Sequence, residues 1–117
     1  MTQLINESCE ACRVGAPTLS DEELAELRAQ IPEWAVVDEE GIKKLRRQFN
    51  FSNFAQAMSF AQQVGDLAEV HNHHPAITVE WGKTTVVWWT HKIRGLHRND
   101  AVLAAKTDAL IQQAPIP

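Results

Sequence analysis

Three histidines and a carboxylate lie within six residues in the second half of the chain, at Glu69, His71, His73 and His74. Pro75 follows, and the chain then alternates apolar and polar positions, which is typical of a β-strand. An unperturbed histidine has a pKa of about 6.5, so its imidazole can both give and take a proton at cellular pH. The cluster therefore indicates acid–base chemistry where a helix ends and a strand begins.

The same cluster has a metal-binding alternative, because imidazole is a common zinc ligand. His73 and His74 are adjacent, and adjacent side chains of an extended segment point to opposite sides, so one ion would rarely take both. Glu69 and His73 have the i, i+4 spacing of one helix face, but the HExxH pattern of a helical zinc site does not occur. Acid–base chemistry is therefore favoured, although a surface loop can also carry any one histidine without a function.

His91 and Asp100, which come later in the chain, belong with the cluster. His91 is expected to end the strand that pairs with the one after Pro75, and antiparallel pairing brings that end beside the cluster. Asp100 falls in the first turn of the expected last helix, so its carboxylate can reach the same end of the sheet. At most one of Trp88 and Trp89 can face the helices, so the other is expected at the site or at a subunit contact.

Residues 20–51 are expected to supply a helix and a hairpin. Ser20 is placed as the N-cap of the helix, Glu23 completes a capping box, and Pro32 ends the apolar periodicity. Two β-type runs follow on either side of a turn that contains Gly41. The pattern predicts one helix followed by two antiparallel strands.

The rest of the chain is expected to supply a long helix, a second hairpin and a last helix. Ser52 is placed as the N-cap of the long helix, which should run to about Val70. Two alternating runs flank Gly82 and Lys83 and predict the second hairpin, and helical periodicity resumes over residues 101–113. The stripe of the long helix that should face the core consists of Phe54, Met58, Ala61, Val64 and Ala68.

The order of elements is α-β-β-α-β-β-α, without repeats or low-complexity segments. It predicts an α+β fold in which a four-stranded antiparallel sheet carries three helices on one face, because each helix has only one apolar stripe to bury. We expect residues 18–117 to form a single domain and residues 1–17 to form a loose N-terminal arm. The arm holds Cys9 and Cys12, and one CxxC pair is a weak signal for metal or redox chemistry.

The bulk composition limits the classes of partner. The 117 residues are 44% hydrophobic, enough for one packed core, and the formal net charge is -4. This charge offers no basic surface to a phosphate backbone, so we expect no direct nucleic-acid binding. No apolar run approaches the roughly 20 residues that span a bilayer, and the first residues lack the features of a signal peptide. We therefore expect a cytoplasmic protein without a membrane segment.

The spacing of the candidate residues resembles the signature of the pterin-4a-carbinolamine dehydratases. Three residues separate Glu69 from the run His73-His74-Pro75, and five separate Pro75 from Trp81. Nine residues then separate Trp81 from His91, and eight separate His91 from Asp100. The segments LSDEELAEL, PEW, RQFNFSNFAQAMSF, EWGKTTVVWWTH and GLHRND are similar to successive family segments in the same order. The resemblance covers about residues 18 to 113 and is greatest to the bacterial enzymes that accompany phenylalanine hydroxylase.

This resemblance implies a hydro-lyase that converts 4a-hydroxytetrahydropterin to quinonoid dihydropterin and water, with neither a metal nor a redox cofactor. It implies a pterin as the small-molecule substrate and a functional link to phenylalanine hydroxylase through pterin recycling. His73 and His91 would then give protons to the hydroxyl, and His74 would bind the pterin. Glu69 and Asp100 would support these imidazoles.

Two further residues match family positions near the pterin. The backbone after Pro75 is expected to line the substrate cleft. Trp34 matches a tryptophan near the ring, although a core or rim aromatic on the first strand explains Trp34 equally well. Asn72 departs from the acidic residue that can precede the histidine pair, which puts a role for this position in doubt.

The resemblance also raises a second function and an assembly. Animal members similar to this chain act as dimerisation partners of a transcription factor, so a non-catalytic protein-binding module on the same fold is the alternative. The exposed edges of a four-stranded sheet must be covered or blunted, and family members pair sheets across subunits. We therefore expect a homodimer or a homotetramer. The first hairpin carries charges expected to blunt an edge, at Lys43, Lys44, Arg46 and Arg47.

Overall fold

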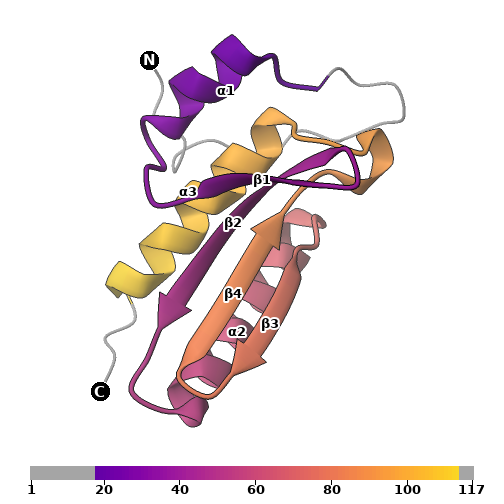
Figure 1. Cartoon of the computed structure of the whole chain (residues 1–117). Coiled ribbons are helices and arrows are strands. Elements are labelled where there is room, and N and C mark those ends of the chain that lie inside the picture. Colours follow the sequence, from indigo (N-terminus) through magenta and orange to yellow (C-terminus); the bar gives the residue numbers. More distant parts are fainter. Residues whose placement is uncertain (1–17, 114–117) are drawn as a thin grey trace.

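The computed structural model describes residues 18–113, and its elements follow the expected order α-β-β-α-β-β-α (Figure 1). The helices are α1 (Asp21–Arg28), α2 (Phe54–His71) and α3 (Arg98–Gln113), with a short 3-10 helix, η2 (His91–Ile93), before α3. The strands are β1 (Ala35–Glu39), β2 (Ile42–Asn50), β3 (Ala76–Glu80) and β4 (Lys83–Trp88). They form one antiparallel sheet in the order β1-β2-β4-β3, which confirms the α+β fold.

One face of the sheet carries the hydrophobic core. Helix α2 packs against β3 and β4, and α3 packs against β2 and β4, so that both helices lie behind the sheet in Figure 1. Along β2, Leu45 and Phe49 are buried toward this side, whereas Arg46, Gln48 and Asn50 between and beyond them are exposed. This alternation matches a sheet with one dry face and one wet face. No helix within residues 18–113 is both long and apolar enough to cross a membrane.

The N-caps of α1 and α2 show how local sequence sets the helix starts. In α1 the Ser20 Oγ accepts from the Glu23 N–H, and the Glu23 carboxylate accepts from the Ser20 N–H, which confirms the capping box. In α2 the N-cap is Asn53, whose Oδ1 accepts from the Gln56 N–H at 2.9 Å. The expected cap at Ser52 is therefore wrong by one residue, because the neighbouring asparagine is an equally good cap.

The buried stripe of α2 agrees with the expected one at Val64 and Ala68 and differs from it nearer the start of the helix. Ala57, Phe60, Val64 and Ala68 face the core, whereas Phe54 and Met58 are 46% and 48% exposed. Both stripes are apolar, so periodicity could not rank them. The stripe that carries Phe60 is the one that packs on the sheet. The centroid of the Phe60 ring lies 4.7 Å from that of Phe49 and 5.3 Å from that of Phe51.

The two hairpins close with two-residue turns that need left-handed backbone. Glu40 and Gly41 have φ of 57° and 80°, and they join β1 to β2. The second turn is Trp81–Gly82, one residue earlier than expected, because Lys83 pairs with Glu80 inside the ladder. Gly82 has φ 73°, and a Cβ there would lie 3.1 Å from the Phe51 carbonyl oxygen, so glycine suits this turn for two reasons.

The basic residues of the first hairpin are expected from the sequence to blunt an edge of the sheet, but they lie on an inner strand. Strand β2 lies between β1 and β4, so the edge strands of the described sheet are β1 and β3. The side chains of β2 instead form ion pairs that tie the strand to three other elements, namely Lys43 with Asp21 of α1, Lys44 with Glu39 of β1 and Arg47 with Asp108 of α3.

Candidate active site

Asn72 ends α2 and turns the chain into the histidine cluster. Its backbone, at φ 50° and ψ 43°, has the left-handed conformation that asparagine tolerates better than most residues. The His73 N–H donates to the Ala68 carbonyl at 3.1 Å, which closes the last turn of the helix. His73 and His74 therefore follow the helix directly, and the position that the resemblance left in doubt acts as a C-cap.

His73 is held inside the molecule. Its side chain is 10% exposed, and its Nε2 lies 2.8 Å from Oδ1 of Asp100. The imidazole also stacks on the indole of Trp88, with ring centroids 5.9 Å apart and 24° between the planes. The Trp88 indole is itself fixed, because it is buried and its Nε1 donates to the Thr107 hydroxyl at 3.1 Å. The stack on Trp88 therefore fixes the plane of the His73 ring, and the contact with Asp100 fixes the direction of its Nε2.

Asp100 is the carboxylate on which this arrangement rests. It is fully buried in the third position of α3, where the positive end of the helix dipole favours a negative group. Its Oδ2 accepts from the Thr90 hydroxyl at 2.7 Å and from the His97 N–H at 2.9 Å, while Oδ1 faces His73. One buried side chain thus joins the end of α2, the end of β4 and the start of α3, and it satisfies the rule that buried polar groups are hydrogen-bonded.

His74 and Glu69 form a second, exposed pair. The His74 Nε2 lies 2.5 Å from Oε2 of Glu69, and the two side chains are 56% and 75% exposed. Pro75 follows His74 and favours an extended backbone there, which leads the chain into β3. An ion pair in water contributes little to stability, so the pairing is better understood as orienting the imidazole than as holding the fold.

His91 lies beside the cluster, although not where the sequence placed it. Strand β4 ends at Trp88, and His91 is the first residue of η2 instead of the last residue of the strand. The His91 Nε2 donates to the His74 carbonyl at 3.2 Å, and the ring stacks on Trp89 with centroids 4.3 Å apart. The chain leaves the ladder after Trp88 because the Thr90 N–H bonds to Gly95, which closes a small loop around η2.

Direct contacts join five of the seven residues chosen from the sequence in two sets, His73 with Asp100, and His74 with Glu69 and His91. The chain links the two sets, because His73, His74 and Pro75 are consecutive. In each of these three imidazoles Nε2 faces an oxygen, which favours a proton on Nε2. A buried histidine–carboxylate pair next to two exposed imidazoles suits proton transfer. Within residues 18–113 no group of three or more His, Cys, Asp or Glu side chains is arranged to hold a metal ion.

Trp34 lies in the core. Its side chain is fully buried, its Nε1 donates to Oδ1 of Asp108 at 2.9 Å, and its ring meets Phe49 edge to face. Burial raises the pKa of Asp108, while the bonds from Trp34 and Arg47 oppose that shift. The structure thus favours the core explanation of this tryptophan. The buried network was missed from the sequence, because nothing in the spacing of Trp34, Arg47 and Asp108 marks them as neighbours.

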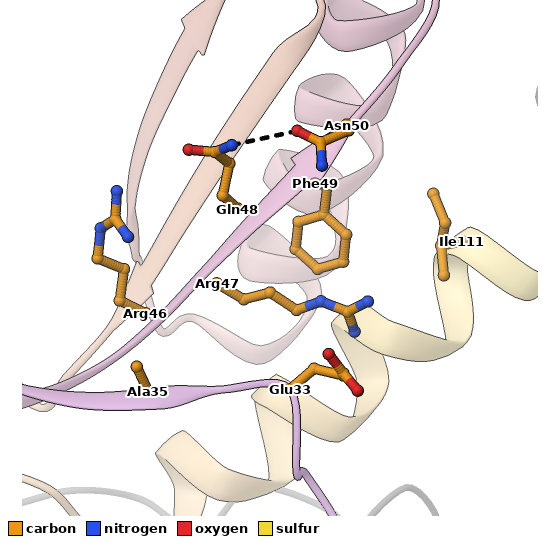
Figure 2. A pocket seen from close by; sticks show the side chains of 8 residues that line it. All are labelled: Glu33, Ala35, Arg46, Arg47, Gln48, Phe49, Asn50 and Ile111. Atoms are coloured by element: carbon orange, nitrogen blue, oxygen red, sulfur yellow. Dashed lines mark hydrogen bonds between the residues drawn. The ribbon is translucent and has the colours of Figure 1, made fainter.

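A hollow of about 490 Å³ lies next to this network and away from the histidines. Figure 2 shows the side chains that line it, most of which are polar and one of which is the aromatic ring of Phe49. The lining consists of Glu33, Ala35, Arg46, Arg47, Gln48, Phe49, Asn50 and Ile111. Ile111 lies eleven residues beyond Asp100 on α3, which corresponds to roughly 16 Å along a helix axis. The hollow carries no imidazole, so we place the candidate chemistry at the histidine cluster.

Comparisons with known proteins point to one family. The family model described as pterin 4 alpha carbinolamine dehydratase matches residues 17–110. A protein of Syntrophotalea carbinolica is 54% identical over 112 residues, which are 96% of this chain and 100% of the relative. One from Nitrosococcus oceani is 49% identical over 112 residues, covering 96% of this chain and 99% of the relative. Both relatives bear the name "Putative pterin-4-alpha-carbinolamine dehydratase".

Solved structures show the same fold. A transcriptional coactivator/pterin dehydratase from Brucella melitensis is 26% identical with a TM-score of 0.72, over 80% of this chain and 98% of its own. A pterin dehydratase-like protein described as a RuBisCO assembly factor of the alpha-carboxysome is 23% identical with a TM-score of 0.57, over 67% of this chain and 88% of its own, and it shows similarity of fold alone. The family model, the relatives of similar length and the shared fold together show that the chain belongs to the pterin-4-alpha-carbinolamine dehydratase family of hydro-lyases.

Proposed function

We propose that this chain dehydrates 4a-hydroxytetrahydropterin to quinonoid dihydropterin and water by histidine acid–base catalysis. In the cell this reaction would support pterin recycling for phenylalanine hydroxylase. The observation that carries the proposal is the pairing of His73 with the buried Asp100, beside the imidazoles of His74 and His91. Loss of water requires groups that move protons on a rigid support, and such groups gather here.

The proposed reaction balances with two proton transfers. The C4a–O bond breaks as the hydroxyl leaves as water, and N5 loses its proton as the C4a=N5 double bond forms. A protonated imidazole supplies the proton that the leaving hydroxyl needs, and a neutral group accepts the proton from N5. We assign the donor role to His73 and His91, and each such transfer is typically worth about 10²–10⁴ in rate.

The remaining residues of the proposed site hold the ring and the imidazoles. His74 and the backbone after Pro75 would bind the flat pterin, with Glu69 orienting His74 from the last turn of α2. Asp100 would hold the His73 ring in its orientation. Trp34 enters the proposal only as support from the core, since its side chain is buried.

The direct test follows the decay of freshly generated 4a-hydroxytetrahydropterin by stopped-flow absorbance, with and without the purified chain. We expect a rate of dehydration that rises in proportion to protein concentration, with quinonoid dihydropterin as the product. The His73→Ala/His91→Ala double variant, purified in the same way, controls for a contaminating dehydratase. Decay at the spontaneous rate at every concentration of the unchanged chain would contradict the proposal.

The second candidate function is a protein-binding module without catalysis. The Brucella melitensis relative is described as a transcriptional coactivator as well as a pterin dehydratase, and this chain exposes Phe54 and Met58 on α2. We rank this function second, because binding alone gives no reason to bury Asp100 against an imidazole. A folded protein that does not accelerate dehydration would reverse the ranking.

Assembly and location complete the proposal. The outer edges of β1 and β3 have no partner strand within residues 18–113, and pairing with a second copy is one way to satisfy such an edge. We infer a homodimer or a homotetramer in the cytoplasm, with one histidine site in each subunit. Light scattering at micromolar concentration measures the mass, and a strictly monomeric enzyme with full activity would contradict this assembly.

A further inference from the structure

Two consecutive tryptophans, Trp88 and Trp89, each stack on a histidine of the cluster at the end of β4. Trp88 is fully buried on the helix side, where His73 stacks on it. Trp89 follows with its side chain on the open side, because successive residues of an extended chain point to opposite faces. The His91 imidazole lies on the Trp89 indole with ring centroids 4.3 Å apart and only 25° between the planes. This contact is the closer of the two stacks.

Trp89 is in turn held from β2 and β1. The Lys44 Nζ lies 4.1 Å from the centroid of the Trp89 ring, a distance that gives a favourable cation–π interaction. The same ammonium group lies 2.8 Å from Oε1 of Glu39, and the Lys44 side chain is only 14% exposed. Glu39, Lys44, Trp89 and His91 therefore form a continuous series of contacts that starts on the edge strand and ends at an imidazole of the proposed site.

His91 needs such support more than His73 does. The residue is exposed, it lies on a 3-10 helix of three residues, and its ring nitrogen bonds to a single backbone carbonyl in this structure. Water competes for that hydrogen bond, so the bond alone would leave the ring free to change rotamer. A misplacement of about 1 Å in a catalytic group can cost roughly 10²-fold in rate. The stack on Trp89 fixes the plane of the ring, which the hydrogen bond does not.

We propose that Trp89 is a positioning residue that holds the His91 imidazole in its reactive orientation, and that Lys44 and Glu39 hold Trp89. This inference rests on the proposed dehydratase function and adds a residue to it. Trp89 acts through His91 and not through the substrate. Its loss should therefore lower kcat and leave KM largely unchanged.

Steady-state kinetics of dehydration by the Trp89→Ala and Trp89→Phe variants test the role. We expect Trp89→Ala to lower kcat by about tenfold, with KM changed by less than about twofold. Phenylalanine keeps an aromatic face, so Trp89→Phe should recover most of the lost kcat. A rise in KM at unchanged kcat would overturn the proposal, because it would show that the indole binds the substrate itself.

A double-mutant cycle with His91→Ala separates positioning from general damage. In the His91→Ala background we expect Trp89→Ala to have no further effect, because the group that it positions is already gone. If the kcat losses of the two single variants multiply in the double variant, the proposal is overturned and Trp89 has a structural role. If His91→Ala alone leaves turnover unchanged, the proposed role of His91 in catalysis fails, and that result is distinct from failure of the cycle.

NMR of the imidazole protons tests the geometry without any activity. A ring stacked 4.3 Å from an indole should show upfield-shifted His91 signals, and Trp89→Ala should abolish that shift. Unchanged His91 signals in Trp89→Ala would overturn the proposal. This readout holds whatever reaction the site performs.

Lys44 and Lys43 offer a matched pair of variants on one strand. Lys43 points to the other side of β2 and pairs with Asp21 of α1, with no contact to Trp89. We expect Lys44→Ala to lower kcat by about two- to fivefold, since a cation–π contact is worth about 0.5–1 kcal/mol at a partly exposed site. Lys43→Ala should leave kcat unchanged. Equal effects of the two variants would show that Lys44 acts only through surface charge.

Discussion

The regions around His73 and His91 hold two imidazoles of the proposed site by different physical means. His73 is 10% exposed and is fixed by a buried carboxylate and a buried indole. His91 is exposed and is fixed by a half-buried indole and a backbone carbonyl. Inside the protein an unpaired polar group is costly, so hydrogen bonds give precision there. At the surface water competes for those bonds, and flat ring contacts supply the precision instead.

The difference also predicts how each region fails when it is disturbed. Around His73 the loss of one partner leaves a buried group without its hydrogen bond, so activity and stability should fall together. Around His91 the loss of one partner frees a ring in water, so activity should fall and stability should hold.

Removal of both imidazoles should have the largest effect. We expect His73→Ala and His91→Ala each to lower turnover by about one to several powers of ten, and the double variant to be worse than either, because each proton transfer contributes on the scale of about 10²–10⁴. Stopped-flow dehydration measures the rates, and circular dichroism checks that the fold survives. Turnover of the double variant equal to that of the unchanged chain would remove the assignment.

Asp100→Asn should have the next largest effect and should separate the buried region from the exposed one. The variant keeps the size of the side chain but removes the charge that orients His73, so we expect roughly a 10²-fold loss of kcat. The mispaired amide should also lower the free energy of unfolding by about 1–3 kcal/mol, as measured by urea denaturation.

Glu69→Gln is the matched control for that variant. Glu69 makes the same type of contact to His74 but is 75% exposed, so we expect a loss of only a few-fold in kcat and no measurable change in stability. Comparable losses in the two variants would mean that burial does not distinguish the two carboxylate–histidine pairs.

The smallest expected effect is the contribution of His71 to the pH dependence of stability. Burial lowers the pKa of His71, and the nearby Lys106 and His73 lower this pKa further. The unfolded chain, with a histidine pKa of about 6.5, then binds more protons than the folded chain between the two pKa values, so stability rises with pH through that window and falls on acidification. His71→Gln should lose less stability than the unchanged chain between pH 7.5 and pH 5 in urea denaturation. An identical pH dependence would show that His71 does not contribute.

The architecture could be predicted from the sequence because its signals are local. The capping box at Ser20, the glycine turn at Gly41 and the alternating run after Pro75 each fix an element within a few residues. The register of the second turn and the buried face of α2 could not be fixed in this way. Both depend on which residues meet across the sheet, such as Phe49 against Phe60.

The site could be predicted in part for a related reason. Residues that one motif brings together, such as His73, His74 and Asp100, lie where the spacing placed them. The supporting contacts of Trp89 with Lys44 and of Trp34 with Asp108 join residues that are distant in sequence and show no spacing signal. Such contacts follow from the register of β2 against β4 and from the packing of α3, which a pattern of residues does not contain.

The proposed function requires the histidine cluster to bind the pterin. The most direct measurement is an NMR titration of the isotope-labelled chain with 7,8-dihydropterin, a stable relative of the product. Binding at the cluster should shift the signals of His73, His74 and His91, with little change around the hollow of Figure 2. Shifts centred on Arg46, Arg47, Gln48 and Asn50, with unchanged histidine signals, would place the pterin in that hollow and contradict binding at the histidine cluster.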